Sequence, residues 1–179
     1  MNKKEELQII AKIKSGDQNA SRKLFDFHAD NLFCFLMQFA KDRDLAEDWT
    51  QNTFIKAFRY INGFHGTSKF STWLFRIGLN EMRSDLKKNN KWNFEDLDAQ
   101  EKLHKVEFED NFEWTHDMKW LLSGLTEEKK AIFILFEVEG YSHSEIAEMM
   151  DTSVVACRTS LSRTKKYLRE KWLKQSETI

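Results

Sequence analysis

The stretch YSHSEIAEMMDTSVVACRTSLSRTKKYLREKW, Tyr141 to Trp172, changes character halfway along. Its first part carries acids, whereas the residues from Thr152 to Lys174 include seven Lys or Arg and one acid, Glu170. The whole chain has a formal net charge of −1. A near-neutral protein therefore gathers positive charge near one end, and the local pattern indicates which kind of element carries that charge.

Two helix starts lie in this stretch. Ser142 and Glu145 have the spacing of a capping box, which predicts a short helix ending at Met150. The following DTS sequence supplies a break and a second cap at Thr152 or Ser153, and a longer basic helix should follow. A short capped helix, a tight turn and a longer helix together form a helix-turn-helix.

The longer helix should run to about Leu173 and have two distinct sides. On a helical wheel one narrow arc is apolar and must pack inward, namely Val154, Cys157, Leu161 and Leu168. The opposite arc holds Val155, Ala156, Thr159, Ser162, Arg163 and Lys166, with Arg158, Lys165 and Arg169 at its boundary. Such a helix fits the major groove, where side chains contact base edges and cations neutralise phosphates. An ordinary solvated basic face is the alternative.

Composition limits the class of protein. The 179 residues include no proline and only six glycines, so nearly the whole chain is predicted to be α-helical. Cys34 and Cys157 are far apart and form no CxxC motif, which fits a reducing cytoplasm and gives no metal framework. No apolar run approaches the roughly 20 residues of a membrane span, and the N-terminus lacks a signal-peptide core. We therefore expect a cytoplasmic protein without membrane insertion.

The charge is unevenly distributed along the chain. Residues 1–88 hold 15 basic and 11 acidic side chains, and residues 119–179 hold ten basic and nine acidic. Residues 89–118 between them hold three basic and nine acidic side chains and have no clean helical period. We expect two helical domains, 1–88 and 119–179, joined by an acidic linker. The alternative is an irregular segment that packs on its neighbours through its aromatic residues.

A second candidate surface lies in the N-terminal half. Helices are predicted from Leu45 to about Ile61 and from about Ser71 to Lys88, with a glycine-bearing loop, NGFHGTSKF, between them. The apolar side of the second helix consists of Phe75, Gly78, Leu79, Met82 and Leu86. Its other side carries a stripe of Trp73, Arg76, Asn80, Arg83 and Lys87. Aromatic groups stack on unpaired bases, amides contact base edges and cations hold the backbone. The alternative is a half-buried core Trp73 beside ordinary solvated charges.

Two blocks of the chain match a known family. The segments AEDWTQNTFIKAF and FHGTSKFSTWLFRIGLN, followed by LTEEKKAIFILFEVEGYSHSEIAEMM and the basic helix, resemble the extracytoplasmic-function (ECF) sigma factors. These belong to the sigma-70 family of bacterial transcription initiation factors. The resemblance covers about Gly16 to Lys88 and Leu125 to Lys171. It implies a region-2 domain that binds polymerase and the promoter −10 element, and a region-4 domain that binds the −35 element.

The resemblance also implies partners and residue roles. Core RNA polymerase would bind through its β′ clamp helices and β flap, and promoter DNA through both domains. An anti-sigma factor is a further candidate partner. The polymerase surface would include Asp48, Trp49, Gln51 and Phe54, although an apolar residue spaced like Phe54 usually belongs to the core. The −10 surface would include Lys56, Phe64, Trp73, Arg76, Asn80 and Arg83. The −35 surface would include Val155, Ala156, Arg158, Thr159, Ser162, Arg163, Lys165 and Lys166.

The chain departs from the family in the turn and at the start of the recognition helix. Family members often have Pro in the turn and Gly-Thr near the helix start, whereas this chain has Ser153, Val155 and Ala156. Ser160 stands where an Arg is common. Val155 and Ala156 would suit thymine methyl groups better than hydrogen-bonding groups. Thr126 should cap the helix that commonly begins with Leu-Pro in the family.

No catalytic pattern is found in the sequence. It has no phosphate-binding loop, no Ser/His/Asp set and no metal cluster, and its five His are scattered. We therefore expect a binding protein without cofactors or metals, in which catalysis belongs to the polymerase. The alternative function is a helix-turn-helix regulator or adaptor that does not melt DNA. A loop followed by Trp73 and Asn80 argues against that alternative, because a simple repressor has no use for a melting surface.

Overall fold

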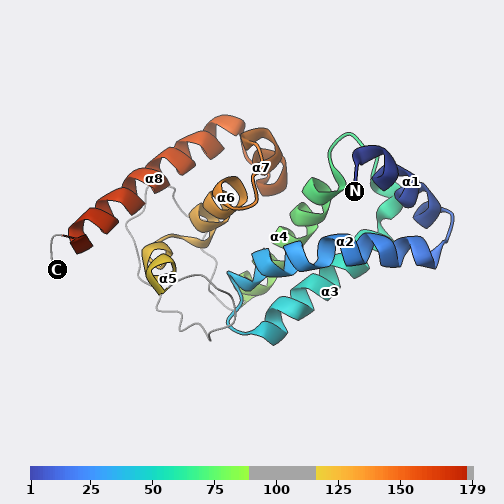
Figure 1. Ribbon diagram of the computed structural model, residues 1–179, viewed down its shortest axis with the longest axis horizontal. Coiled ribbons are helices and arrows are strands. Elements are labelled where there is room, and N and C mark those ends of the chain that lie inside the picture. Colours follow the sequence, from blue (N-terminus) through green and yellow to red (C-terminus); the bar gives the residue numbers. More distant parts are fainter. Residues whose placement is uncertain (89–115, 177–179) are drawn as a thin grey trace. The chain divides into compact units, whose positions relative to one another are not determined.

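A computed structural model describes residues 1–88 and 116–176 of the chain. Every regular element in these ranges is a helix, and the chain divides into two compact units, Met1–Lys88 and Asn89–Ile179 (Figure 1). The predicted all-α fold with two small helical units is therefore confirmed. The predicted acidic linker, 89–118, lies outside the described residues except for its last three, which begin a helix. None of the described helices is long and apolar enough to cross a membrane.

The first unit is a bundle around three long helices. It contains α1 (Lys3–Lys14), α2 (Gln18–Met37), α3 (Arg43–Arg59), the 3₁₀ turn η1 (Ile61–Gly63) and α4 (Phe70–Lys88). The helices α2, α3 and α4 all pack on one another, and α1 packs on α2 and η1. Figure 1 shows α2 and α3 lying side by side. The fully buried side chains at the centre include Leu24, Leu32, Phe35, Leu74 and Phe75, and each contributes roughly 1.5–3 kcal/mol by leaving water.

Polar caps fix where these helices begin. Asn2 and Glu5 form a capping box at the start of α1, and Asp17 accepts hydrogen bonds from two backbone N–H groups at the start of α2. Asp42 accepts from the Leu45 backbone N–H at 2.9 Å, so α3 begins two residues before the predicted Leu45. The N-cap side chain accepts a hydrogen bond from a backbone N–H in the first turn of the helix. The helix therefore begins directly after the cap, before the first apolar residue of the sequence pattern.

The predicted α4 agrees closely with the structure. It begins at Phe70 instead of Ser71, and all five residues assigned to its apolar side are buried. Gly78 lies where α4 approaches α2, since a Cβ at this position would be 3.1 Å from Leu32 Cδ1. The glycine therefore allows α4 to pack closely on α2. The side of α4 opposite Gly78 consequently faces outward.

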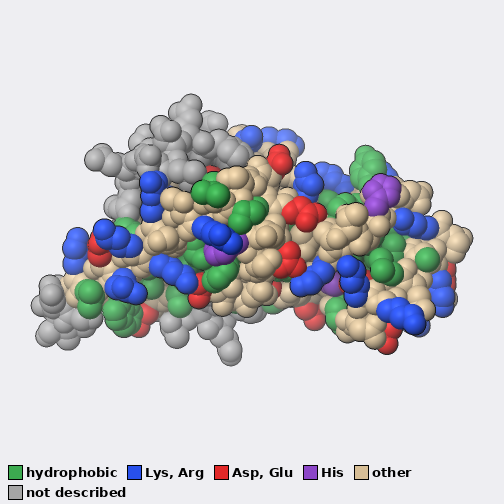
Figure 2. Space-filling model, turned by 90° about the horizontal axis from the view of Figure 1, so that it is seen from above, with side chains coloured by type: hydrophobic (Ala, Val, Ile, Leu, Met, Phe, Trp, Pro, Cys, Tyr) green, Lys and Arg blue, Asp and Glu red, His purple; other side chains and the backbone are tan. Residues whose placement is uncertain are grey.

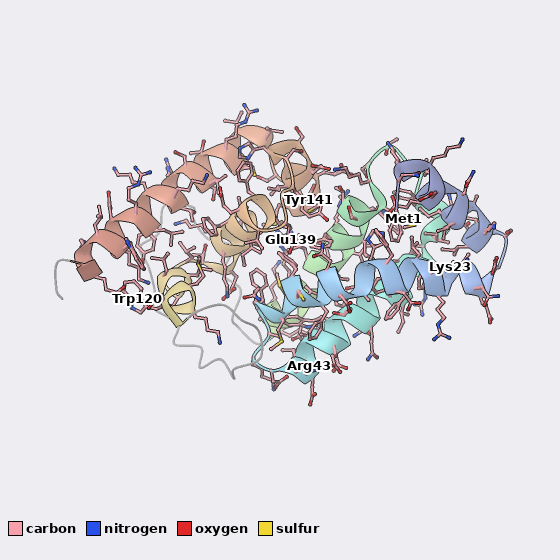
Figure 3. All side chains as sticks on the ribbon, in the orientation of Figure 1. Met1, Lys23, Arg43, Trp120, Glu139 and Tyr141 are labelled. Atoms are coloured by element: carbon pink, nitrogen blue, oxygen red, sulfur yellow. The ribbon has the colours of Figure 1, made fainter. Side chains whose placement is uncertain are left out.

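The second unit is built on one long helix. It contains α5 (His116–Leu122), α6 (Glu127–Glu137), α7 (His143–Met150) and α8 (Val154–Ser176), and the three shorter helices pack on α8. Trp120 on α5 lies beside α8 (Figure 3), where Lys171 Nζ donates to the Trp120 carbonyl at 2.7 Å and lies 4.5 Å from the indole centre. This contact holds α5 against the C-terminal half of α8.

The predicted helix-turn-helix is confirmed in its caps and turn. Ser142 and Glu145 form the capping box of α7. Asp151 adopts a left-handed conformation with φ 55° and ends α7, and Ser153 accepts from the Ala156 backbone N–H at 3.0 Å. Of the two candidate caps for α8, Ser153 is therefore the one used. Thr126 caps α6, as predicted, by accepting from the Lys129 backbone N–H at 3.4 Å.

The apolar arc of α8 packs inward almost as predicted. Cys157, Leu161 and Leu168 are buried, and Val154 is half-buried. Burial raises the pKa of the Cys157 thiol, whose Sγ lies 3.8 Å from His143 Nδ1 on α7. The helix continues to Ser176 instead of ending near Leu173. The side opposite this arc is consequently left at the surface.

Candidate nucleic-acid interface

The outer side of α8 presents apolar, hydroxyl and cationic side chains together. Val155 is 71% exposed, Ala156 is half-buried, and six further predicted residues are exposed: Arg158, Thr159, Ser162, Arg163, Lys165 and Lys166. Figure 2 shows Lys and Arg side chains along the part of the surface that α8 occupies. All eight residues predicted for the −35 surface thus lie on the outer side of one capped helix.

Two of these cations are paired with acids in the free protein. Lys165 Nζ lies 2.5 Å from Glu137 Oε1, at the end of α6, and 5.2 Å from the centre of the Phe136 ring. Lys166 Nζ lies 3.9 Å from Glu170 Oε1 within α8. The ion pair of Glu137 with Lys165 was not predicted. It depends on how α6 packs on α8, and no local sequence pattern indicates that packing.

The structure corrects the interpretation of Ser160. Its side chain is buried, like that of Thr164 one turn later, and both face the other helices of the unit. The departure from the family at Ser160 therefore falls on the packed side of α8. The unusual part of the exposed edge is confined to its start, at Val155 and Ala156.

Lys130 does not contribute to this basic surface. It is buried within α6, and burial lowers the pKa of its ammonium group although the charge of Glu127 opposes the shift. A buried cation of this kind cannot contact a phosphate without leaving the core. The cations of the candidate −35 surface are thus those of α8.

In the first unit, α4 and the loop before it form the second candidate surface. Arg76 and Asn80 are exposed, Trp73 is half-buried, and Lys56 reaches across from α3 to form an ion pair with Glu81. Glu81 was not among the predicted residues. The pair places an acid beside Asn80, in the middle of a surface that the sequence predicted to be cationic.

Two buried aromatic rings, Phe64 and Phe70, pack against Trp73 in this surface. The Phe64 ring centre is 5.6 Å from that of Phe70, nearly perpendicular to it, and 5.4 Å from that of Trp73. Phe64 is only 4% exposed. Its ring is therefore covered, and the prediction that Phe64 belongs to the −10 surface is not supported by its burial. Trp73, half-buried on this support, is the aromatic group that remains accessible.

The predicted exposed stripe on α4 is wrong at Arg83. This side chain is 7% exposed and lies among the buried residues of the helix. The wheel angle of Arg83 is close to that of Arg76, yet Arg76 is exposed and Arg83 is buried. Arg83 therefore acts in the interior of the unit and not on an open stripe.

The residues predicted to bind polymerase separate into two groups. Asp48 and Gln51 are exposed on α3, whereas Trp49 and Phe54 are each 2% exposed. Phe54 packs against Phe25 with ring centres 4.6 Å apart, which supports the alternative that it is a core residue. Trp49 is likewise part of the interior. The exposed apolar side chain on this helix is Ile55, which the sequence did not single out.

The described residues contain no candidate metal site. No group of three or more His, Cys, Asp or Glu side chains there is arranged to hold a metal ion. His28 lies beside Glu6, and His143 stacks on Phe136 with ring centres 4.5 Å apart. These contacts join helices to one another.

A helix-turn-helix unit with an exposed basic helix, together with a second helical unit that presents Trp73, Arg76 and Asn80, defines a DNA-binding protein of the helix-turn-helix class. Family comparison agrees with this description. The family model "Sigma-70 region 2" matches residues 24–92, and the model "Sigma-70, region 4" matches residues 120–168. The chain belongs to the sigma-70 family of RNA polymerase sigma factors, in the ECF group.

Curated relatives cover almost the whole chain. The chain is 27% identical to the ECF RNA polymerase sigma-E factor of Haemophilus influenzae, covering 91% of this chain and 93% of the relative. It is 26% identical to the RNA polymerase sigma-H factor of Pseudomonas aeruginosa, covering 92% of each.

Solved structures share the fold. CnrH, solved in complex with the cytosolic domain of CnrY, is similar with a TM-score of 0.66 and 23% identity, over 90% of this chain and 93% of that one. RpoE of Bartonella quintana, solved with the anti-sigma factor NepR, is similar with a TM-score of 0.64 and 22% identity, over 83% and 94%.

Proposed function

We propose that this protein binds core RNA polymerase, directs it to promoters with matching −10 and −35 elements, and promotes melting of the −10 region. One observation carries the proposal. The matches to regions 2 and 4 fall, in that order, on two helical units that each present an exposed surface suited to DNA. A regulator that only binds duplex DNA would need the second unit alone.

The second unit would bind the −35 element as a duplex. The N-terminal half of α8 would enter the major groove, where Val155 and Ala156 face thymine methyl groups and Thr159 and Arg163 approach base edges. Arg158, Ser162, Lys165 and Lys166 would contact the phosphate backbone. Lys165 would exchange Glu137 for a phosphate oxygen on binding.

The first unit would bind the −10 element as a single strand. Unstacking a base costs on the order of a few kcal/mol, and stacking on an aromatic side chain returns roughly 1–3 kcal/mol. Trp73 would provide the stacking surface, with Phe64 and Phe70 as its buried support. Asn80 would hydrogen-bond the base, and Arg76 and Lys56 would hold the strand backbone.

The exposed part of α3 would contact the polymerase. Asp48 and Gln51 would bind the β′ clamp helices, while Trp49 and Phe54 would hold α3 in place from inside. The second unit would contact the β flap. The nucleotide chemistry would belong to the polymerase, so this chain would act by binding and not as an enzyme.

Two further proposals concern its surroundings. The protein would work in the cytoplasm, where polymerase and DNA are found. An anti-sigma factor would be a further partner, as the similar Bartonella quintana protein was solved in complex with the anti-sigma factor NepR.

Runoff transcription with purified core polymerase tests this function. Promoters are first selected from genomic DNA by polymerase reconstituted with the protein, and transcripts are then measured with and without it. We expect transcripts that depend on the protein and that start at one position downstream of a shared −10 sequence. Binding of the protein to the selected DNA with no initiation would instead favour a regulator or adaptor.

A further inference from the structure

The N-terminal helix α1 touches the loop that joins η1 to α4. Lys14 Nζ, in the last turn of α1, donates a part-buried hydrogen bond of 2.7 Å to the Phe64 backbone carbonyl. This carbonyl stands at the beginning of the loop, 50 positions away in the sequence. A charged donor makes a stronger hydrogen bond than a neutral one, and its loss would leave the carbonyl without this partner in a part-buried setting.

A second contact lies in the middle of the loop. Gly66 has φ +74°, which a side chain rarely adopts, and a Cβ there would lie 3.1 Å from Leu7 Cδ2 on α1. The Leu7 side chain therefore lies directly against the backbone at the point where the loop turns. This close approach is possible because the residue is glycine.

A third contact holds α1 near the end of the loop. Glu6 Oε1 lies 2.9 Å from His28 Nε2, and both side chains are largely buried. The His28 ring in turn packs on Phe70, the first residue of α4, with centres 5.3 Å apart. The helix α1 is thus connected to the beginning, the middle and the end of the same loop.

These contacts matter because the middle of the loop has no regular secondary structure. Residues 65–69 form no helix or strand, and His65, Thr67 and Lys69 have exposed side chains. The buried rings of Phe64 and Phe70 hold only the two ends. The position of the intervening backbone relative to Trp73 therefore depends on α1.

We propose that α1 sets the position of the loop 64–70, and that Lys14 is a positioning residue for base recognition at this loop. The effect on DNA rests on the proposed function, in which Trp73 and Asn80, on the helix that follows this loop, hold an unpaired −10 base. Lys14 itself contacts no DNA. It acts through the Phe64 carbonyl, so its loss should change which base is preferred more than how tightly DNA is held.

The first test measures the loop in the free, full-length protein. Hydrogen exchange of residues 65–69 is compared for wild type, Lys14→Met, Lys14→Arg and Lys12→Met. The last variant removes the same charge from an exposed position on the same helix. We expect about 10-fold faster exchange in Lys14→Met, partial recovery in Lys14→Arg and no change in Lys12→Met. Wild-type exchange in Lys14→Met would overturn the proposal.

Leu7→Ala provides an independent variant that should fold, because Leu7 is 39% exposed and is not one of the buried core residues. It should also speed exchange at Gly66 while the circular dichroism spectrum stays unchanged. Uniform acceleration throughout the first unit, in either variant, would show general destabilisation and would contradict a specific role of α1 at the loop.

The second test measures base preference. Holoenzyme is bound to labelled single-stranded −10 DNA carrying the selected sequence or one with a single changed base. We expect the ratio of the two affinities to fall about 5-fold in Lys14→Met, with Lys12→Met unchanged. Faster exchange with an unchanged ratio would overturn the role in base recognition. A wild-type protein with no preference would contradict the proposed function instead, and the exchange result would still decide whether α1 holds the loop.

Discussion

Val155 combines a large exposed apolar side chain with a position in the first turn of α8. An exposed apolar side chain at a helix start does not stabilise the free protein by burial. In a complex with DNA, the same side chain could contact a thymine methyl group in the major groove. The neighbouring Ala156 is half-buried and leaves room for close approach. At the residue scale, the start of this recognition helix is therefore suited to thymine more than to guanine.

Val155→Ala tests this assignment. Removing two methyl groups should weaken binding to the preferred −35 duplex by up to about 1.5 kcal/mol, since each buried carbon contributes roughly 0.8 kcal/mol. The check is a titration repeated with uracil in place of each −35 thymine. At the position contacted by Val155, the difference between wild type and variant should disappear when the methyl group is absent. A difference that persists at every position would contradict the methyl contact.

Burial explains which residues could be chosen correctly from the sequence. The exposed side of α8 was predicted throughout, because one helix with a single apolar arc has only one outer side. Arg83 was misplaced because a helical wheel gives the direction of a side chain but not which neighbouring residues cover it. Phe64 was misplaced because no periodicity applies to a loop, and the Phe64–Phe70–Trp73 cluster forms only once the loop has closed.

At the scale of elements, caps account for most of the agreement between sequence and structure. Ser142, Thr126 and Ser153 lie at the helix starts that the sequence predicted. A cap and its partner are three residues apart, so the signal is local. The contact of Lys14 with Phe64 joins positions that are far apart in the sequence, so no local sequence pattern predicts it.

Ser142→Ala should destabilise the helix-turn-helix. It removes the hydroxyl that accepts from the Glu145 backbone N–H and donates to its carboxylate, at a cost of about 1 kcal/mol. Ser144→Ala, an exposed serine on the same helix, serves as the control and should cost a few tenths of this. Urea unfolding monitored by circular dichroism measures both. Equal stability of the two variants would show that the box contributes nothing.

Pairing of Lys165 with Glu137 across α6 and α8 should weaken DNA binding. The pair is partly exposed and stabilises the fold by less than about 1 kcal/mol, but it competes with phosphate for the same ammonium group. Glu137→Gln should therefore raise affinity for −35 DNA roughly 3-fold at low salt and steepen its salt dependence.

The control is Glu128→Gln, at the opposite end of α6, which changes the net charge equally. Affinity measured by fluorescence anisotropy should rise less in this variant. An equal rise in both would mean that the effect comes from net charge and not from release of Lys165.

At the scale of the whole molecule, the proposed function requires one chain to carry two DNA-binding surfaces and a separate surface for polymerase. The two exposed residues of α3 that were predicted to bind polymerase are an acid and an amide, Asp48 and Gln51, whereas Lys56 on the same helix belongs to the candidate −10 surface. A carboxylate is repelled by DNA phosphates, so Asp48 suits a protein partner better than DNA. The order of the two units could be predicted from the sequence because each carries its own motif.

Asp48→Ala combined with Gln51→Ala should weaken association with core polymerase by about 10-fold or more without loss of helix content. Both side chains are exposed, so the fold should not depend on them. Binding to an isolated −35 duplex should be unchanged, which serves as the internal control. Affinity for core polymerase equal to that of wild type would place the polymerase surface elsewhere on the unit.

The central claim is that the first unit holds the −10 element after its strands separate. Permanganate reactivity of −10 thymines, measured with wild-type and Asn80→Ala holoenzyme on the same promoter, tests it most directly. Loss of one hydrogen bond of roughly 1.4 kcal/mol should lower the open fraction about 10-fold, while binding of core polymerase and of the −35 duplex stays the same. A pre-melted bubble should restore part of the signal. Wild-type reactivity in Asn80→Ala holoenzyme would contradict the account.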